Sequence, residues 1–281
     1  MSIIVVDRQV VRYEVFGQGR PVLFLHGWQG SWRYWLPTIE CAAQQFRTYS
    51  FDFWGFGESR RKHTEINIQN YCDQVIRFMD KLGIDRVQLV GHSMGGMVAL
   101  KTAINHPDRI SRVAAVGAPI NGDSLSWLLK LTDRPVLADA FVAMPWLRRY
   151  MFKLFLGQFN DPSVREILDD SVKSNATTLR HAVGSMWRTD LRPELHRLTM
   201  PTLIVHGGRD DVVNPNQAEL FDHVLAAQVV VMPESRHFPF LDEPETFNDV
   251  LMCFLNQDAP RQRRPTPLKQ PLAVSSLEGA A

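Results

Sequence analysis

The stretch that decides the fold is RVQLVGHSMGGM, which runs from Arg86 to Met97. Its apolar run ends at Gly91, Ser93 follows, and two glycines lead into an apolar helical pattern. This order predicts a strand, a very tight turn and a helix, with the Ser93 hydroxyl at the apex of the turn. A serine there has a strained backbone, and the small neighbours Gly91 and Gly95 leave room for it. The helix would direct free N–H groups and its positive dipole end toward a developing oxyanion.

A serine hydroxyl is a weak nucleophile at neutral pH, so this interpretation requires a base and a group that orients the base. Candidates for both follow predicted strands, the first of which is buried. Residues 201–207 predict a strand that leads to Asp210, and residues 229–232 predict a strand that leads to His237. The chain order serine, aspartate, histidine accompanies this type of turn in one large group of enzymes.

With the turn, the chain order and both flanking contexts, residues 10–257 resemble the α/β-hydrolase superfamily, and within it the capped serine esterases and lipases. The resemblance implies a mostly parallel central sheet with helices on both faces and an inserted helical cap. It implies a Ser93, Asp210 and His237 triad. It also implies an oxyanion hole made by the backbone N–H groups of Trp28, third in a His-Gly-x segment, and Met94.

The acid of the triad has a rival in the neighbouring residue. After the aspartate the family usually shows Asp-x-Val/Ile-Val-Pro, whereas here Asn214 separates Val213 from Pro215. The extra residue keeps Asp211 as an alternative, because Asp211 lies four positions before the proline. The distance from the preceding strand favours Asp210.

The chain divides into three predicted parts. Residues 1–119 and 199–257 form the hydrolase core, and residues 120–198, which contain helical patterns without a convincing strand, form the cap. Residues 258–281 are rich in proline and arginine without periodicity, which predicts a disordered or loosely attached tail.

Aromatic residues suggest an apolar substrate pocket, although such residues more commonly only pack a core. They are frequent in the predicted cap, and others lie beside the His-Gly-x segment or follow His237. The candidates for pocket lining are Trp32, Trp127, Trp146, Phe155 and Phe238.

Composition narrows the class of protein. With 31 basic and 30 acidic residues the net charge is +1, which gives no reason to expect nucleic acid as a partner. The cysteines, three in number and widely spaced, predict neither a disulfide framework nor a metal site, and no cofactor is expected. The start lacks a signal-peptide pattern and no apolar run is long enough to cross a membrane, so we expect a cytoplasmic protein. Membrane-surface contact has little support, and the oligomeric state is not predicted.

The expected activity is hydrolysis of small apolar esters, with medium-chain acyl or aromatic groups, through an acyl-enzyme. Hydrolysis of carbon–carbon, thioester or peptide bonds and acyl transfer remain alternatives, as does a ligand-binding module that kept the fold without the chemistry. We expect His26 to hold its loop in place, and we assign no role to the remaining histidines, including His92 and His206.

Overall fold

A computed structural model describes residues 2–59, 66–156 and 164–257. Its centre is an eight-stranded sheet in the order β1-β2-β4-β3-β5-β6-β7-β8. β1 pairs antiparallel with β2, and β2 pairs antiparallel with β4, whereas all other neighbours are parallel. The strands are β1 Ser2–Val6, β2 Gln9–Phe16, β3 Pro21–Leu25, β4 Arg47–Phe51, β5 Val87–His92, β6 Ile110–Val116, β7 Thr202–Gly207 and β8 Ala227–Met232.

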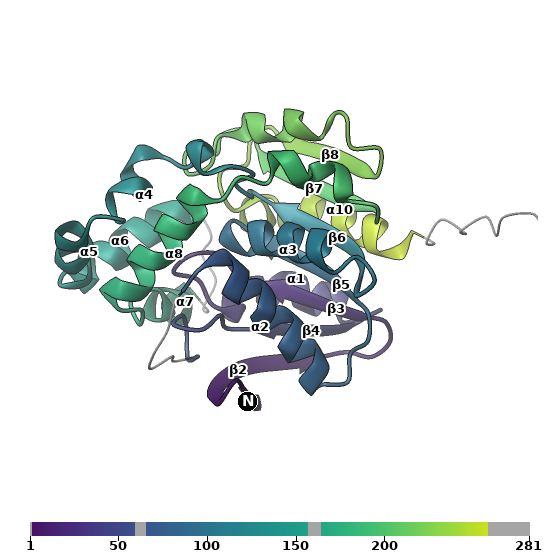
Figure 1. Cartoon of the computed structure of the whole chain (residues 1–281), viewed down its shortest axis with the longest axis horizontal. Helices are drawn as coiled ribbons and strands as arrows, with labels where there is room; N and C mark the ends of the chain where they lie inside the picture. Colours follow the sequence, from purple (N-terminus) through teal and green to yellow (C-terminus); the bar gives the residue numbers. More distant parts are fainter. Residues whose placement is uncertain (1, 60–65, 157–163, 258–281) are drawn as a thin grey trace, which may run out of the picture.

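Helices cover both faces of the sheet, as Figure 1 shows. On one face lie α2 (Ile68–Lys81) and α3 (Met94–Asn105), and on the other α1 (Leu36–Ala42) packs beside α10 (Pro244–Asn256). Alternate residues of one strand feed the two cores, because strand side chains point to opposite faces in turn. In β3, Leu23 belongs to the core under α2 and α3, and Phe24 belongs to the core under α1 and α10. The predicted fold class is confirmed.

Five further helices follow one another between β6 and β7 and gather at one end of the sheet (Figure 1). Among the described residues of 120–198 there are helices and isolated bridges but no strand. The helices are α4 Trp127–Leu131, α5 Pro135–Val142, α6 Pro145–Phe155, α7 Val164–Ser171 and α8 Ala176–Arg188. Residues 258–281, predicted as a tail, lie outside the described residues.

Short helical turns complete the chain. They are η1 Trp32–Trp35, η2 Gly122–Ser124, η3 Arg192–Arg197, η4 Pro215–Phe221 and α9 Pro239–Asp242. In the part of the chain that the structure describes, no helix is both long and apolar enough to cross a membrane.

Helices α4 to α8 are called the helical layer below. An ion-pair cluster joins one of them, α7, to the part of the molecule that contains the sheet. The guanidinium of Arg33, in η1, lies 2.7 Å from a carboxylate oxygen of Asp170 and 3.0 Å from one of Glu166, both in α7. A third carboxylate, that of Glu58, lies 3.6 Å away on the loop after β4. Because Asp170 is almost fully buried, this contact fixes α7 against the core.

Candidate active site

Ser93 stands between β5 and α3 with φ of +54° and ψ of −119°, a conformation that is strained for a residue with a side chain. Gly91 and Gly95 make this turn sterically feasible. A Cβ on Gly91 would collide with the carbonyl oxygen of Gly95, and one on Gly95 would collide with that of Leu25. The strand, turn and helix therefore meet in the way that the sequence indicates, with Ser93 as the N-cap of α3.

Asp210 and His237 form a buried pair at the ends of neighbouring parallel strands. The Oδ2 atom of Asp210 lies 2.8 Å from Nδ1 of His237. The other oxygen, Oδ1, accepts hydrogen bonds from the backbone N–H groups of Val212 and Val213 at 2.9 and 3.0 Å. Burial alone would raise the pKa of Asp210, but the attraction of His237 and these hydrogen bonds hold that pKa below its ordinary value.

The ionised carboxylate of Asp210 accepts a hydrogen bond, so Nδ1 of His237 carries the ring proton in neutral imidazole. The second nitrogen, Nε2, then keeps its lone pair and can accept a proton. An imidazole in this state is a general base.

The neighbouring aspartate has a different partner. Oδ2 of Asp211 lies 2.6 Å from Nη2 of Arg236, and both side chains are largely exposed. Arg236 also donates from Nη1 to the carbonyl oxygen of Leu154 in α6, at 3.2 Å. The geometry thus brings Asp210, and not Asp211, to His237. Arg236 therefore connects the loop that carries His237 with α6.

Ser93 and His237 line one narrow cavity with a volume of about 30 Å³. Gly27, Trp28 and Phe238 also line it. The cavity therefore brings the strained serine, the imidazole and the His-Gly-x segment to one place, although these residues come from three distant parts of the chain.

Of the two predicted oxyanion donors, Trp28 lines this cavity and Met94 directly follows Ser93. Met94 is the first residue of α3, where the N–H group has no acceptor within the helix. The carbonyl of Gly27 is held by Nδ1 of His26 at 2.7 Å and by the N–H of Gly30 at 3.1 Å. Because the peptide is planar and trans, the N–H of Trp28 points to the opposite side from that carbonyl.

His26 is a structural residue, as the sequence suggests. Its Nε2 accepts the N–H of Phe53 at 2.9 Å, so its proton is on Nδ1, facing the Gly27 carbonyl. Burial lowers the pKa of His26 to about 4, against a smaller opposing effect of the hydrogen bond to Gly27. The imidazole is therefore neutral near pH 7 and holds two loops together.

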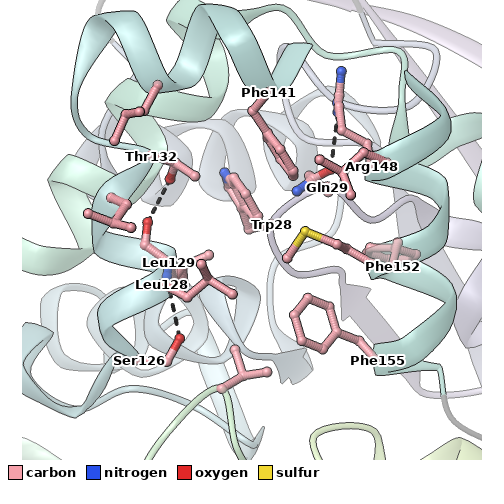
Figure 2. Close-up of a pocket in the computed structure, with 15 residues that line it drawn as sticks. Trp28, Gln29, Ser126, Leu128, Leu129, Thr132, Phe141, Arg148, Phe152 and Phe155 are labelled. Atoms are coloured by element: carbon pink, nitrogen blue, oxygen red, sulfur yellow. Dashed lines mark hydrogen bonds between the residues drawn. The ribbon is translucent and has the colours of Figure 1, made fainter. Parts of the chain in front are cut away.

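A larger apolar cavity of about 230 Å³ lies next to the Ser93 cavity, and Figure 2 shows its lining. The indole of Trp28 stands in the middle of the view, with α4 residues on one side and Phe152 and Phe155 on the other. Five residues line both cavities, so the cavities are direct neighbours. These residues are Trp28, Leu129, Phe152, Phe155 and Val212. An apolar group of a bound molecule could thus lie in the larger cavity while its polar end reaches Ser93.

The structure corrects part of the predicted pocket lining. Phe155 lines both cavities and Phe238 lines the one at Ser93, but Trp32, Trp127 and Trp146 line neither. Trp127 and Trp146 point outward, with 73% and 69% of their surface exposed. Trp32 is buried beside Phe16 and under the guanidinium of Arg33.

The cavity walls also contain Leu129, Phe152 and Val212, which are not among the predicted pocket residues. Helical spacing in α6 contains a signal for one of them, since Phe152 is four residues after Arg148 and three before Phe155, and all of these line the larger cavity. Val212 follows the triad loop and has no recognisable pattern in the sequence.

The sequence assigns no role to His92, but the structure gives it two hydrogen-bonded contacts. It is fully buried, with Nδ1 3.0 Å from the hydroxyl of Tyr34 and Nε2 2.8 Å from the backbone oxygen of His237. Burial first, and then the nearby His237, lower the pKa of His92 well below its ordinary value. Its imidazole is thus neutral and fully hydrogen-bonded.

The described ranges 2–59, 66–156 and 164–257 contain no group of three or more histidine, cysteine or acidic side chains that could hold a metal ion. The hydroxyl of Ser93 and the imidazole of His237, which is paired with a carboxylate, meet at one cavity, and groups of these kinds can carry out acyl transfer.

A mostly parallel sheet with this strand order and a serine strained between strand and helix define a class of protein. The chain belongs to the α/β-hydrolase family, since the model of the alpha/beta hydrolase fold matches residues 20–244.

Several relatives are esterase-like. The chain is 27% identical over 259 residues to a pimeloyl-[acyl-carrier protein] methyl ester esterase of Vibrio vulnificus, covering 87% of this chain and 97% of that one. It is 28% identical over 263 residues to a dihydrolipoyllysine-residue acetyltransferase component of the acetoin cleaving system of Pseudomonas putida, covering 87% of this chain but only 66% of that relative. An esterase from Exiguobacterium antarcticum has a similar structure, with a TM-score of 0.76, 25% identity, and coverage of 91% and 99%.

Proposed function

We propose that this α/β-hydrolase cleaves carboxylic esters of apolar substrates through an acyl-enzyme on Ser93. The observation that carries the proposal is the Asp210–His237 pair, 2.8 Å apart, whose histidine shares a cavity with the strained serine. A nucleophile, a base and a group that orients the base are the minimum set for this chemistry.

In the proposed reaction, Nε2 of His237 removes the hydroxyl proton as Oγ of Ser93 attacks the ester carbonyl carbon. The N–H groups of Trp28 and Met94 donate to the resulting oxyanion, and Asp210 stabilises the imidazolium. The imidazolium gives its proton to the leaving alkoxide, and the carbon–oxygen bond to the alcohol breaks. Water, deprotonated by His237, then attacks the acyl-enzyme, which releases the acid and restores the Ser93 hydroxyl.

The substrate class follows from the larger cavity. We propose that helices α4 to α8 act as the cap, with residues 120–198 as its limits, and that its apolar wall binds a medium-chain acyl or aromatic group. Each buried methylene contributes about 0.8 kcal/mol, so three more carbons would raise kcat/KM roughly 50-fold until the chain outgrows the cavity. The esterase names of relatives support the reaction type, not the identity of the substrate.

A series of p-nitrophenyl esters from acetate to palmitate tests the proposal. We expect the highest kcat/KM at intermediate length, loss of kcat by a factor of about 10⁶ in Ser93→Ala, and loss of fluorophosphonate labelling in the same variant. Labelling that survives in Ser93→Ala would remove Ser93 from the mechanism. Labelled Ser93 without turnover of any ester in the series would favour thioester or carbon–carbon bond hydrolysis, acyl transfer or peptidase action.

A further inference from the structure

The buried side chains of Tyr34 and His92 connect three segments of the candidate active site through a string of hydrogen bonds. The hydroxyl of Tyr34 accepts the backbone N–H of Gly27 and lies 3.0 Å from Nδ1 of His92. Nε2 of His92 lies 2.8 Å from the backbone oxygen of His237. Tyr34 and His92 each have no more than 1% of their surface exposed.

The chemistry of the partners fixes the direction of every hydrogen bond in this string. A carbonyl oxygen only accepts, so Nε2 of His92 carries the ring proton and Nδ1 offers a lone pair. The hydroxyl proton of Tyr34 must therefore point to His92, which leaves a lone pair of the same oxygen for the N–H of Gly27. Every polar atom of the two side chains then has a hydrogen-bond partner, although both side chains are almost fully buried.

Burial keeps both groups in the forms that this arrangement needs. It raises the pKa of Tyr34 well above its ordinary value, with a smaller opposing effect of Gly27, so the hydroxyl stays protonated. The lowered pKa of His92 keeps that imidazole neutral.

We propose that Tyr34 and His92 are positioning residues that set the relative placement of the three catalytic segments. The proposal rests on the proposed function. Gly27 directly precedes Trp28, the proposed oxyanion donor, and His92 directly precedes the nucleophile Ser93. The third segment is reached through the backbone oxygen of His237, which accepts the hydrogen bond from His92. One string of hydrogen bonds thus connects the oxyanion loop after β3, the turn after β5 and the histidine loop after β8.

The surrounding packing makes the string rigid. The rings of Tyr34 and Phe238 pack edge to face with 5.7 Å between their centroids. The centroid of the His92 ring lies 4.6 Å from that of Phe238 and 5.1 Å from that of Phe240. These aromatic residues follow His237 in the chain, so a shift of the histidine loop would disturb both the rings and the hydrogen bonds. A displacement of about 1 Å among catalytic groups can cost 100-fold in rate.

The variant Tyr34→Phe removes the hydroxyl and keeps the ring. We expect kcat on the best p-nitrophenyl ester to fall roughly 10- to 100-fold with KM nearly unchanged, because the groups lose their alignment rather than the binding cavity. The second-order rate of fluorophosphonate labelling of Ser93 should fall in parallel, and this measurement needs no substrate.

Tyr71→Phe is the matched control. The hydroxyl of Tyr71 is equally buried and lies 3.1 Å from the backbone oxygen of Trp54, and Tyr71 lines neither cavity. We expect a similar decrease in melting temperature in both variants but a decrease in kcat only in Tyr34→Phe. Equal stability losses with unchanged kcat in both would reduce Tyr34 to a packing residue and overturn the proposal.

His92→Gln tests the second member of the string, since glutamine can keep an N–H near the position of Nε2 but removes the ring acceptor. Because both side chains act in one string, Tyr34→Phe should cost little further in the His92→Gln background. Additive losses would contradict the string. Histidine ¹⁵N NMR of the wild type should show the Nε2–H tautomer of His92, and the His237 ring resonances should move in Tyr34→Phe. This readout separates the two proposals, because it tests the string even if no ester is hydrolysed.

Discussion

The Nδ1 atom of His237 lies 2.8 Å from Oδ2 of Asp210. The loop after β7 holds the carboxylate of Asp210 in the orientation that this contact needs. Because the N–H groups of Val212 and Val213 hold Oδ1, the carboxylate is fixed and only Oδ2 faces the imidazole. A carboxylate fixed in this way selects one tautomer of His237 and one orientation of its ring.

Replacement of the two adjacent aspartates should therefore have unequal effects. Asp210→Asn should lower kcat on the best ester by about 10⁴, because the amide no longer stabilises the imidazolium or the correct tautomer. Asp211→Asn, which removes only an exposed ion pair with Arg236, should leave kcat nearly unchanged. Steady-state kinetics of both variants check this, and a larger loss in Asp211→Asn would transfer the role to that residue.

Local patterns account for the parts of the fold that the sequence predicts. The turn at Ser93 is determined within a few residues, because a Cβ at Gly91 or Gly95 would collide with backbone atoms. The chain order of Asp210 and His237 after the neighbouring parallel strands β7 and β8 is enough to predict that they meet, since the carboxyl ends of parallel strands lie at one edge of the sheet.

What the sequence does not predict depends on contacts between distant segments. The outward orientation of Trp127 and Trp146 follows from which side of each helix faces the core. In α6 the buried side carries Arg148 and Phe152, and in α4 no residue is fully buried, so the apolar character of the two tryptophans does not give their direction. The role of His92 depends on Tyr34 and on a backbone oxygen 145 positions away. Neither composition nor residue spacing predicts such a contact.

Two aromatic residues of α6 offer a direct test of the cavity. Phe155 lines both cavities, whereas Trp146 in the same helix is 69% exposed and lines neither. Phe155→Ala should remove the preference for medium-chain esters and retain acetate hydrolysis, because short acyl groups do not reach the apolar wall. Trp146→Ala should keep the wild-type chain-length profile. Equal damage to all substrates in Phe155→Ala would indicate that this ring only packs the helix.

The ion-pair cluster at Arg33 should stabilise the contact between the helical layer and the sheet. Arg33→Gln removes one of two cations that pair with the buried Asp170, since Lys173 remains 2.5 Å away, and we expect the free energy of unfolding to fall by about 2 kcal/mol. The control is Arg149→Gln, which breaks a half-exposed pair with Asp169 and should cost at most about 1 kcal/mol. Urea unfolding of both variants measures the difference. Similar small losses would show that the Arg33 ion pairs add little to the contact between α7 and the core.

Buried neutral histidines should make the protein sensitive to acid. Burial lowers the pKa of both His26 and His206 to about 4, far below the value of about 6.5 for an unfolded chain. Between pH 6.5 and 4 the unfolded chain binds protons that the folded protein does not. Stability that is fully present above pH 6.5 is therefore lost as the pH falls, by up to about 1.4 kcal/mol per pH unit for each histidine. Buried Asp52, whose pKa rises to about 7, acts in the opposite direction, so a comparison of variants is needed.

His206 allows this effect to be isolated. Neither of its ring nitrogens has a hydrogen-bond partner among the described residues, so His206→Leu removes a buried titrating group without breaking a hydrogen bond. At pH 7.5 the variant should be about as stable as the wild type. At pH 5 it should be more stable by about 2 kcal/mol, because its unfolded chain gains one proton fewer. By contrast, His26→Leu breaks the hydrogen bonds to Gly27 and Phe53 and should be less stable already at pH 7.5. Urea unfolding from pH 4.5 to 7.5 measures both curves, and parallel curves for His206→Leu and the wild type would mean that His206 titrates normally in the folded protein.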